Sequence, residues 1–148
     1  RPYPGPAGSG FSFGNYVSAL NNMGTTTALS SSAITFNIAN IAGSITYNNG
    51  IFNLDNTASS ASAIFLVTLC YSSWGSELDS GNFTIEVSIN SGPLNQYGNT
   101  INASNGFVSG GASTTIVIVP ATQIGQLIIA ANGNYYDNEI SLTIVQIN

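Results

Sequence analysis

The chain contains no histidine and no lysine, and Arg1 is its single basic residue. Acid–base and phosphate-transfer chemistry generally needs a histidine, a cation or a carboxylate cluster at the reacting centre. Six acidic residues against one basic residue give a net charge of −5. Because no basic patch can form, we expect no binding to nucleic acid or to anionic membranes. The sequence therefore favours a structural or recognition role, without a cofactor, over an enzyme.

Charged residues of both signs are also scarce. They make up 5% of the chain, against about a quarter in an average globular protein. Apolar residues make up 43% of the 148 residues, which is enough for one domain with a packed core. The surface must then consist of hydroxyl and amide groups, which suits an extracellular protein. Long hydrophobic runs are absent too: none reaches the ~18 residues of a membrane span, so no membrane insertion is expected.

The single cysteine, Cys70, lies in the most hydrophobic run of the chain, residues 63–71. It has no second cysteine for an intramolecular disulfide and no histidine to activate its thiol. The run is apolar at nearly every position, which predicts a central strand covered on both faces. We therefore expect Cys70 to be buried and unreactive.

Most of the remaining sequence carries β-strand signals, which are short apolar runs rich in β-branched residues. They predict strands at residues 11–20, 34–38, 41–47, 51–54, 63–71, 83–89, 114–119, 126–131 and 140–147. Polar connections are predicted at residues 21–32, 72–81 and 93–111. No segment shows a helical period. About eight to ten short strands with these spacings predict an all-β sandwich or jelly roll.

The first ten residues are rich in proline and glycine, with Gly5 and Gly8 three residues apart. Glycine at every third position is what a collagen triple helix requires, because only glycine fits at its axis. One triplet is equally compatible with an extended linker. We therefore assign residues 1–10 to the end of a collagen-like stalk or to a linker, and residues 11–148 to one head domain.

The order of segments resembles the carboxy-terminal domain of the collagen-like exosporium glycoproteins of spore-forming bacteria, a branch of the complement/TNF-like jelly-roll superfamily. The similar segments contain Phe11 and Phe13, Ile34-Thr35-Phe36-Asn37, Gly50-Ile51-Phe52, Ala63-Ile64-Phe65, Gly81-Asn82-Phe83-Thr84-Ile85-Glu86-Val87 and Ser141-Leu142-Thr143-Ile144-Val145. Ala63 stands where the family usually has glycine. Ile124-Gly125-Gln126 stands where many relatives have Gly-Asp.

The resemblance implies a jelly roll of about ten antiparallel strands that forms a homotrimer at the end of a collagen-like stalk. It implies a structural surface protein, the trimerising head of a filament on a spore or cell surface such as the exosporium. The alternative on the same fold is a glycan- or receptor-binding head, lectin-like or at a phage or virus fibre tip. A carbohydrate or host-receptor ligand would belong to that alternative.

Two carboxylate pairs are candidates for a calcium site, Glu77 with Asp79 and Asp137 with Glu139, because oxygen-rich loops bind calcium. Neither pair has the EF-hand spacing, and solvated loop carboxylates are the favoured explanation, so we predict no metal. Paired acids also occur in glycoside hydrolases, but no supporting motif accompanies these. The aromatic residues in or beside loops suit either ligand contact or a subunit interface: Tyr71, Trp74, Tyr97, Tyr135 and Tyr136. Asn82 and Asn102 begin N-glycosylation sequons, which chance alone can explain in an Asn/Ser-rich chain.

Overall fold

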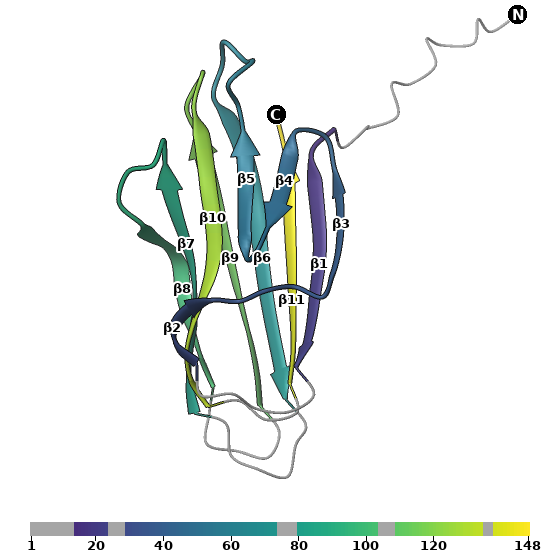
Figure 1. Ribbon diagram of the computed structural model, residues 1–148, viewed down its shortest axis with the longest axis vertical. Helices are drawn as coiled ribbons and strands as arrows, with labels where there is room; N and C mark the ends of the chain where they lie inside the picture. The colour runs from purple at the N-terminus through teal and green to yellow at the C-terminus, as the bar shows by residue number, and fades with distance from the viewer. Residues whose placement is uncertain (1–13, 24–28, 74–79, 104–108, 135–137) are drawn as a thin grey trace, which may run out of the picture.

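The structure is a computed structural model that describes residues 14–23, 29–73, 80–103, 109–134 and 138–148. These residues form eleven β-strands, and the strands make two antiparallel sheets packed face to face (Figure 1). Within the described ranges, no helix has the length and hydrophobicity that a membrane crossing needs.

Each sheet combines strands from distant parts of the chain. Sheet A has the order β3 (Ile38–Ala42), β1 (Tyr16–Met23), β11 (Asn138–Gln146), β6 (Ala63–Ser73), β9 (Ser109–Val119). Sheet B has the order β4 (Ile45–Asn48), β5 (Ile51–Asp55), β10 (Ile124–Asn134), β7 (Ser80–Ile89), β8 (Asn95–Ala103), and β2 (Leu29–Ala33) also pairs with β10. This crossed connectivity is that of a jelly roll. The predicted fold class is confirmed.

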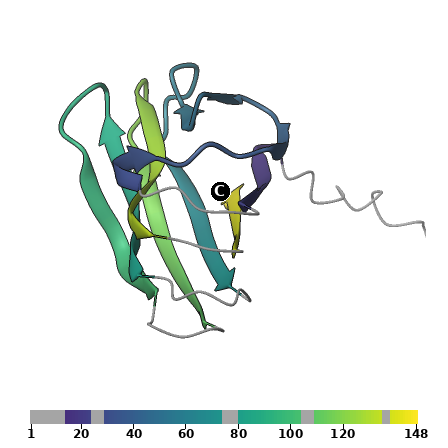
Figure 2. The ribbon, with the colours of Figure 1, turned by 60° about the horizontal axis from the view of Figure 1, so that its bottom comes forward.

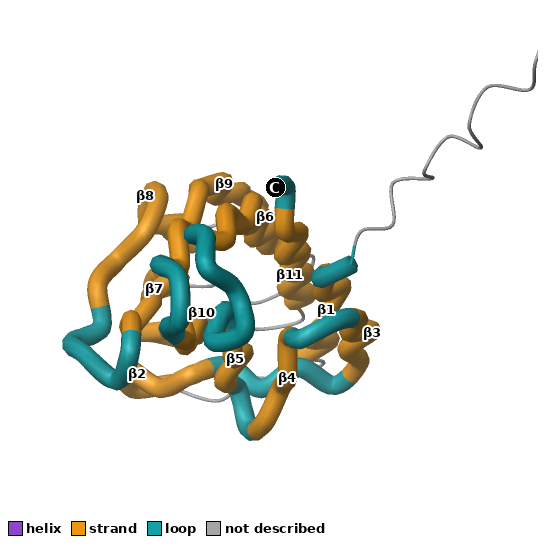
Figure 3. The backbone as a smooth tube through the Cα atoms, turned by 90° about the horizontal axis from the view of Figure 1, so that it is seen from above, coloured by secondary structure: helices purple, strands orange, loops and turns teal. Residues whose placement is uncertain are grey.

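The core lies between the two sheets, which Figure 3 shows from above. Strand alternation sends every second side chain inward, and the inward side chains are almost all apolar. The central strands β6 and β7 contribute fully buried residues at 0–1% exposure: Phe65, Val67, Leu69, Phe83, Ile85 and Val87. Burying one such side chain contributes roughly 1.5–3 kcal/mol, so this layer is the main source of stability.

Residues 34–37 connect β2 in sheet B to β3 in sheet A across one open side of the sandwich (Figure 2). Alternation in this segment predicts a strand, and that prediction is wrong. Ile34 and Phe36 are buried as the alternation requires. Their backbone N–H groups, however, form isolated hydrogen bonds and not the ladder of a paired strand. The Ile34 N–H donates to Ile129 O at 2.8 Å, and the Phe36 N–H donates to Tyr47 Oη at 2.7 Å. Burial of alternate side chains produced the pattern without strand pairing.

Residues 93–111 are predicted to be a long loop, and that prediction is wrong for much of the segment. Strand β8 occupies residues 95–103, and β9 begins at Ser109. The register of β8 against β7 shifts at a bulge. Gly98 lies in this bulge with a φ of 70°. A Cβ there would stand 2.8 Å from Ser113 Oγ on β9, so glycine lets the edges of the two sheets approach each other.

The other strand predictions are mostly confirmed, with shifted boundaries. The first strand begins at Tyr16 rather than residue 11, and residues 11–13 lie outside the described ranges. The strand predicted over residues 41–47 is divided between β3 and β4 by a turn. Gly43 forms that turn with a φ of 80°, where a Cβ would collide with Asn15.

Asn56 ties the loop after β5 to the connection between β9 and β10. Its side chain is 6% exposed. The Nδ2 group donates to the carbonyl oxygens of Ala61 at 2.9 Å, Val119 at 3.1 Å and Pro120 at 3.0 Å. Its backbone N–H donates to Gln123 O at 3.0 Å. One buried amide therefore fixes these two connections together.

Candidate functional site

The strand β6 is apolar on both faces, as predicted, but only one face is covered in a single chain. Of the alternate residues that face away from the core, Leu66 and Cys70 are exposed, and Ile64 and Thr68 are half-buried. The prediction that Cys70 is buried is therefore wrong for the single chain. Both faces of a strand can be apolar when the second cover is another molecule, and the sequence pattern does not distinguish that case from a doubly covered strand.

Two rows of large apolar side chains cross the outer face of sheet A, the face opposite the core. The registers of β1, β11, β6 and β9 place one row as Tyr16–Val145–Leu66–Ile116. The next row is Ile147–Ile64–Ile118, since Ile64 pairs with Ile118 and the Ile147 N–H donates to Ile64 O at 2.9 Å. Ile118 is 52% exposed and Ile116 is 44% exposed. We call these seven residues the apolar rows.

Below the apolar rows, the same face becomes polar. The next row across the four strands consists of hydroxyl side chains, Ser18–Thr143–Thr68–Thr114. The Oγ1 atoms of Thr68 and Thr114 lie 3.5 Å apart. The row after that is Leu20–Ser141–Cys70–Ala112, with mostly small side chains. The face thus changes along the strands from large apolar to hydroxyl to small.

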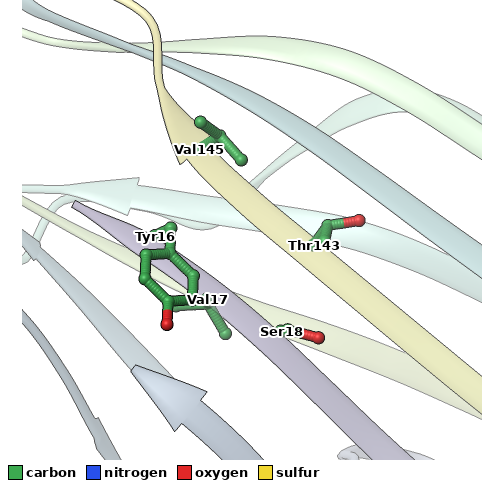
Figure 4. A pocket seen from close by; sticks show the side chains of 5 residues that line it. All are labelled: Tyr16, Val17, Ser18, Thr143 and Val145. Carbon is green, nitrogen blue, oxygen red and sulfur yellow. The ribbon is translucent and has the colours of Figure 1, made fainter. Parts of the chain in front are cut away.

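A shallow groove of about 330 Å³ lies between β1 and β11 on this face. Figure 4 shows its lining side chains, which come from these two strands only. Tyr16 and Val145 belong to the apolar rows, and Ser18 and Thr143 to the hydroxyl row. The groove is therefore a recess within the same face, of the kind that a side chain from a partner surface can fill.

The apolar rows lie at the end of the sandwich where both ends of the described chain meet. β1 begins there and β11 ends there (Figure 1). The Asn15 Nδ2 donates to Gln146 Oε1, and the Gln146 N–H donates to Asn15 O at 3.0 Å. Asn148 Oδ1 accepts the N–H of Ile64 at 2.8 Å. Whatever precedes the head domain therefore joins it beside the apolar rows.

Three carboxylates belong to the described residues: Asp55, Glu86 and Glu139. None of them lies in the apolar rows. Asp55 lies at the end of β5 and is exposed. The Thr57 side-chain hydroxyl donates to its Oδ1 at 2.6 Å and the Thr57 N–H donates at 2.9 Å. These bonds hold the pKa of Asp55 below its ordinary value, because they stabilise the charged form.

Only one of the four calcium candidates is described. Glu139 is half-buried on β11, while Glu77, Asp79 and Asp137 lie outside the described residues. In the part of the chain that the structure describes, no three acidic or cysteine side chains gather as a metal site would require. The calcium hypothesis therefore has no geometric support from these residues.

The aromatic candidates divide in the same way. Tyr97 is half-buried on β8 and packs against the core. Tyr71 is 3% exposed, and its ring lies 4.9 Å from that of Phe83. Trp74, Tyr135 and Tyr136 lie outside the described ranges. The two sequon asparagines, Asn82 and Asn102, are direct partners in the pairing of β7 with β8.

Sequence reasoning did not identify the apolar rows as a site. The available signal was that two strands, residues 63–71 and residues 114–119, carry apolar residues at consecutive positions. The pattern became a site only when the register aligned these strands side by side and brought Tyr16 and Val145 into the same row.

The solved structures with a fold similar to that of this chain include two that align with most of it. The globular domain of zebrafish complement 1qA protein aligns over 90% of this chain and 97% of its own, with a TM-score of 0.59 and 12% identity. The PRD1 vertex protein P5 aligns over 91% of this chain and 98% of its own, with a TM-score of 0.58 and 15% identity. These likenesses define the class of fold: a jelly roll of the complement/TNF type. No family model matches the sequence, and no curated protein matches it.

Proposed function

We propose that this chain is the trimerising head of a collagen-like filament displayed on the surface of a spore or cell. The observation that carries the proposal is the pair of apolar rows on the outer face of sheet A. A contiguous patch of exposed apolar side chains marks an association surface in a soluble protein. The role is structural, so it requires no catalytic residue and no cofactor.

Three-fold association explains more of the observations than two-fold association does. A collagen triple helix combines three chains, and Gly5 and Gly8 have the collagen spacing. Three heads around one axis can each place the outer face of sheet A against a neighbour, which closes the assembly.

The position of the apolar rows suits this role. They lie beside Asn15, where a preceding stalk enters the head. An apolar contact at that end holds three chains together close to the point where their triple helix must begin. The hydroxyl row that follows can form hydrogen bonds between subunits without burying a charge, and an unpaired buried charge is the most costly feature of such an interface.

Light scattering on two matched variants tests the proposal. Ile118→Asp places a charge in the apolar rows, and Leu94→Asp makes the same change outside sheet A, at a residue exposed to 51% against 52% for Ile118. We expect wild type and Leu94→Asp to have three times the 15.3-kDa chain mass, and Ile118→Asp to have one. Retention of the oligomer by Ile118→Asp, or its loss in both variants, would show that the apolar rows are not the interface.

A further inference from the structure

A second groove crosses the outer face of sheet B, over β5, β10 and β7. Its volume is about 370 Å³, which lies in the lower part of the ~300–1,000 Å³ range of small-molecule sites. Sheet B forms the other side of the sandwich from the apolar rows. Association through the outer face of sheet A would therefore leave this groove open to solvent, and the inference does not depend on that association.

The lining combines apolar side chains with uncharged hydrogen-bonding groups. Ile51, Leu94 and Ile128 provide the apolar surface, while Asn49, Ser91 and Gln126 provide amides and a hydroxyl; no residue that lines this groove carries a charge. Sites for small ligands typically pair an apolar surface with a few polar groups that fix orientation. The groove has both components.

The Gln126 amide is held in a row of hydrogen bonds across the sheet. Its Nε2 donates to Asn53 Oδ1 at 3.2 Å, and Asn53 Nδ2 donates to Thr46 Oγ1 at 3.4 Å. One of the two side-chain N–H groups of Gln126 is used in this row. The other N–H and Oε1 have no hydrogen-bond partner among the described residues and are available to a ligand. A side chain ordered in advance loses less conformational entropy on binding.

Ser91 occupies a backbone conformation that glycine would adopt more easily. The turn between β7 and β8 has Asn90 at φ 52° and Ser91 at φ 61°. The Gly92 N–H closes it by donating to Ile89 O at 2.9 Å. A left-handed conformation is strained for a residue that has a Cβ. The serine hydroxyl in the groove wall therefore comes at a cost to stability, and strain of this kind is often found at binding sites.

We propose that this groove binds a neutral saccharide of about two sugar rings. A sugar ring presents apolar C–H faces beside hydroxyl groups, and Ile51, Leu94 and Ile128 match the first while Asn49, Ser91 and Gln126 match the second. Without an aromatic ring in the lining, the affinity is weak, because stacking is absent. Three such heads on one stalk would bind a polysaccharide more tightly through multivalency.

Other ligand classes fit this lining less well. An anionic sugar would find no cation in the groove and would approach a chain of net charge −5. A cationic ligand would find no carboxylate in the lining. A purely apolar ligand would desolvate the Gln126 amide and the Ser91 hydroxyl without replacing their hydrogen bonds to water, which is unfavourable for each group.

Amide NMR of the full ¹⁵N-labelled chain tests the inference with cellobiose, maltose, lactose and diacetylchitobiose as neutral probes and glucuronic acid as the charged probe. We expect at least one neutral disaccharide to produce saturable shifts at Asn49, Ser91 and Gln126. Gln126→Leu should weaken that binding at least tenfold, and Ser91→Gly several-fold. Gln96→Leu is the matched control, since this exposed glutamine on β8 does not line the groove, and it should bind as wild type does.

The inference is overturned if no neutral disaccharide shifts the groove residues, if glucuronic acid alone does so, or if Gln126→Leu binds as well as Gln96→Leu. Shifts confined to the outer face of sheet A would overturn it equally. A folded amide spectrum of Gln126→Leu shows that its loss of binding is local. Ile118→Asp should retain the saccharide shifts even when it is monomeric, so failure of the saccharide site and failure of the trimer are separate results.

Discussion

Replacing Asn56 by alanine should lower the free energy of unfolding by about 3 kcal/mol, within a range of about 2–5 kcal/mol. Asn56 Nδ2 lies 2.9–3.1 Å from three backbone carbonyl oxygens and its side chain is 6% exposed. An amide nitrogen carries two N–H groups, so about two full hydrogen bonds are lost. The carbonyls left behind are partly buried, and water that enters the space recovers part of the loss.

Two further variants separate the hydrogen bonds from the volume of the side chain. Asn53→Ala removes an asparagine on the exposed side of sheet B, whose Nδ2 donates to Thr46 Oγ1 at 3.4 Å and whose Oδ1 accepts from Gln126 Nε2 at 3.2 Å. Because these partners can bond to water instead, the change should cost less than about 1 kcal/mol. Asn56→Asp keeps the shape but points a carboxylate at three carbonyl oxygens. At neutral pH it should therefore be more destabilising than Asn56→Ala.

Urea denaturation, followed by intrinsic fluorescence at one fixed protein concentration, measures these differences. The concentration must be equal because association contributes to apparent stability. If Asn56→Ala loses no more stability than Asn53→Ala, or if Asn56→Asp is the milder of the two Asn56 variants, the reasoning that the buried amide fixes the two connections together is refuted.

Two other predictions concern single turns. Ser91→Gly should raise the free energy of unfolding by about 0.5–1 kcal/mol, because glycine adopts φ 61° without strain; a destabilised variant in the same urea experiment would contradict this. The carboxyl pKa of Asp55, measured by NMR titration, should lie below the ordinary aspartate value and should move back towards it in Thr57→Val, which loses the hydroxyl donor. Since the pKa is lowered in the folded state, the stability from this group is present at neutral pH and is lost as the pH falls through the folded pKa; an unchanged pKa in Thr57→Val would assign the effect elsewhere.

The sequence was sufficient to predict the fold class because the inward faces of β6, β7, β10 and β11 contain few exceptions to the apolar pattern. Strand β8 was missed because it has too few apolar residues to show a clear alternation. Tyr97 and Ile101 both pack inward, but they are four residues apart, and the bulge at Gly98 disrupts the register between them. The segment is also rich in asparagine and glycine, a composition that is typical of a loop.

The candidate site could be predicted less well than the fold. The rule that alternation gives one buried face was sound for Ile34 and Phe36, yet it does not say whether a segment pairs with a neighbour. The rule that a doubly apolar strand is doubly covered failed at Cys70, because the cover is absent from a single chain. The apolar rows combine residues as distant as Tyr16 and Ile116, and only the topology and register bring these together.

The measurement that tests the central claim most directly is the mass of the wild-type chain in solution. Light scattering across a dilution series at micromolar concentration should give three times 15.3 kDa at every point. A constant mass would show that the three heads stay associated on dilution, as the alignment of a stalk requires. A mass of 15.3 kDa, or a mass of two chains, would contradict the trimeric head and with it the proposed role.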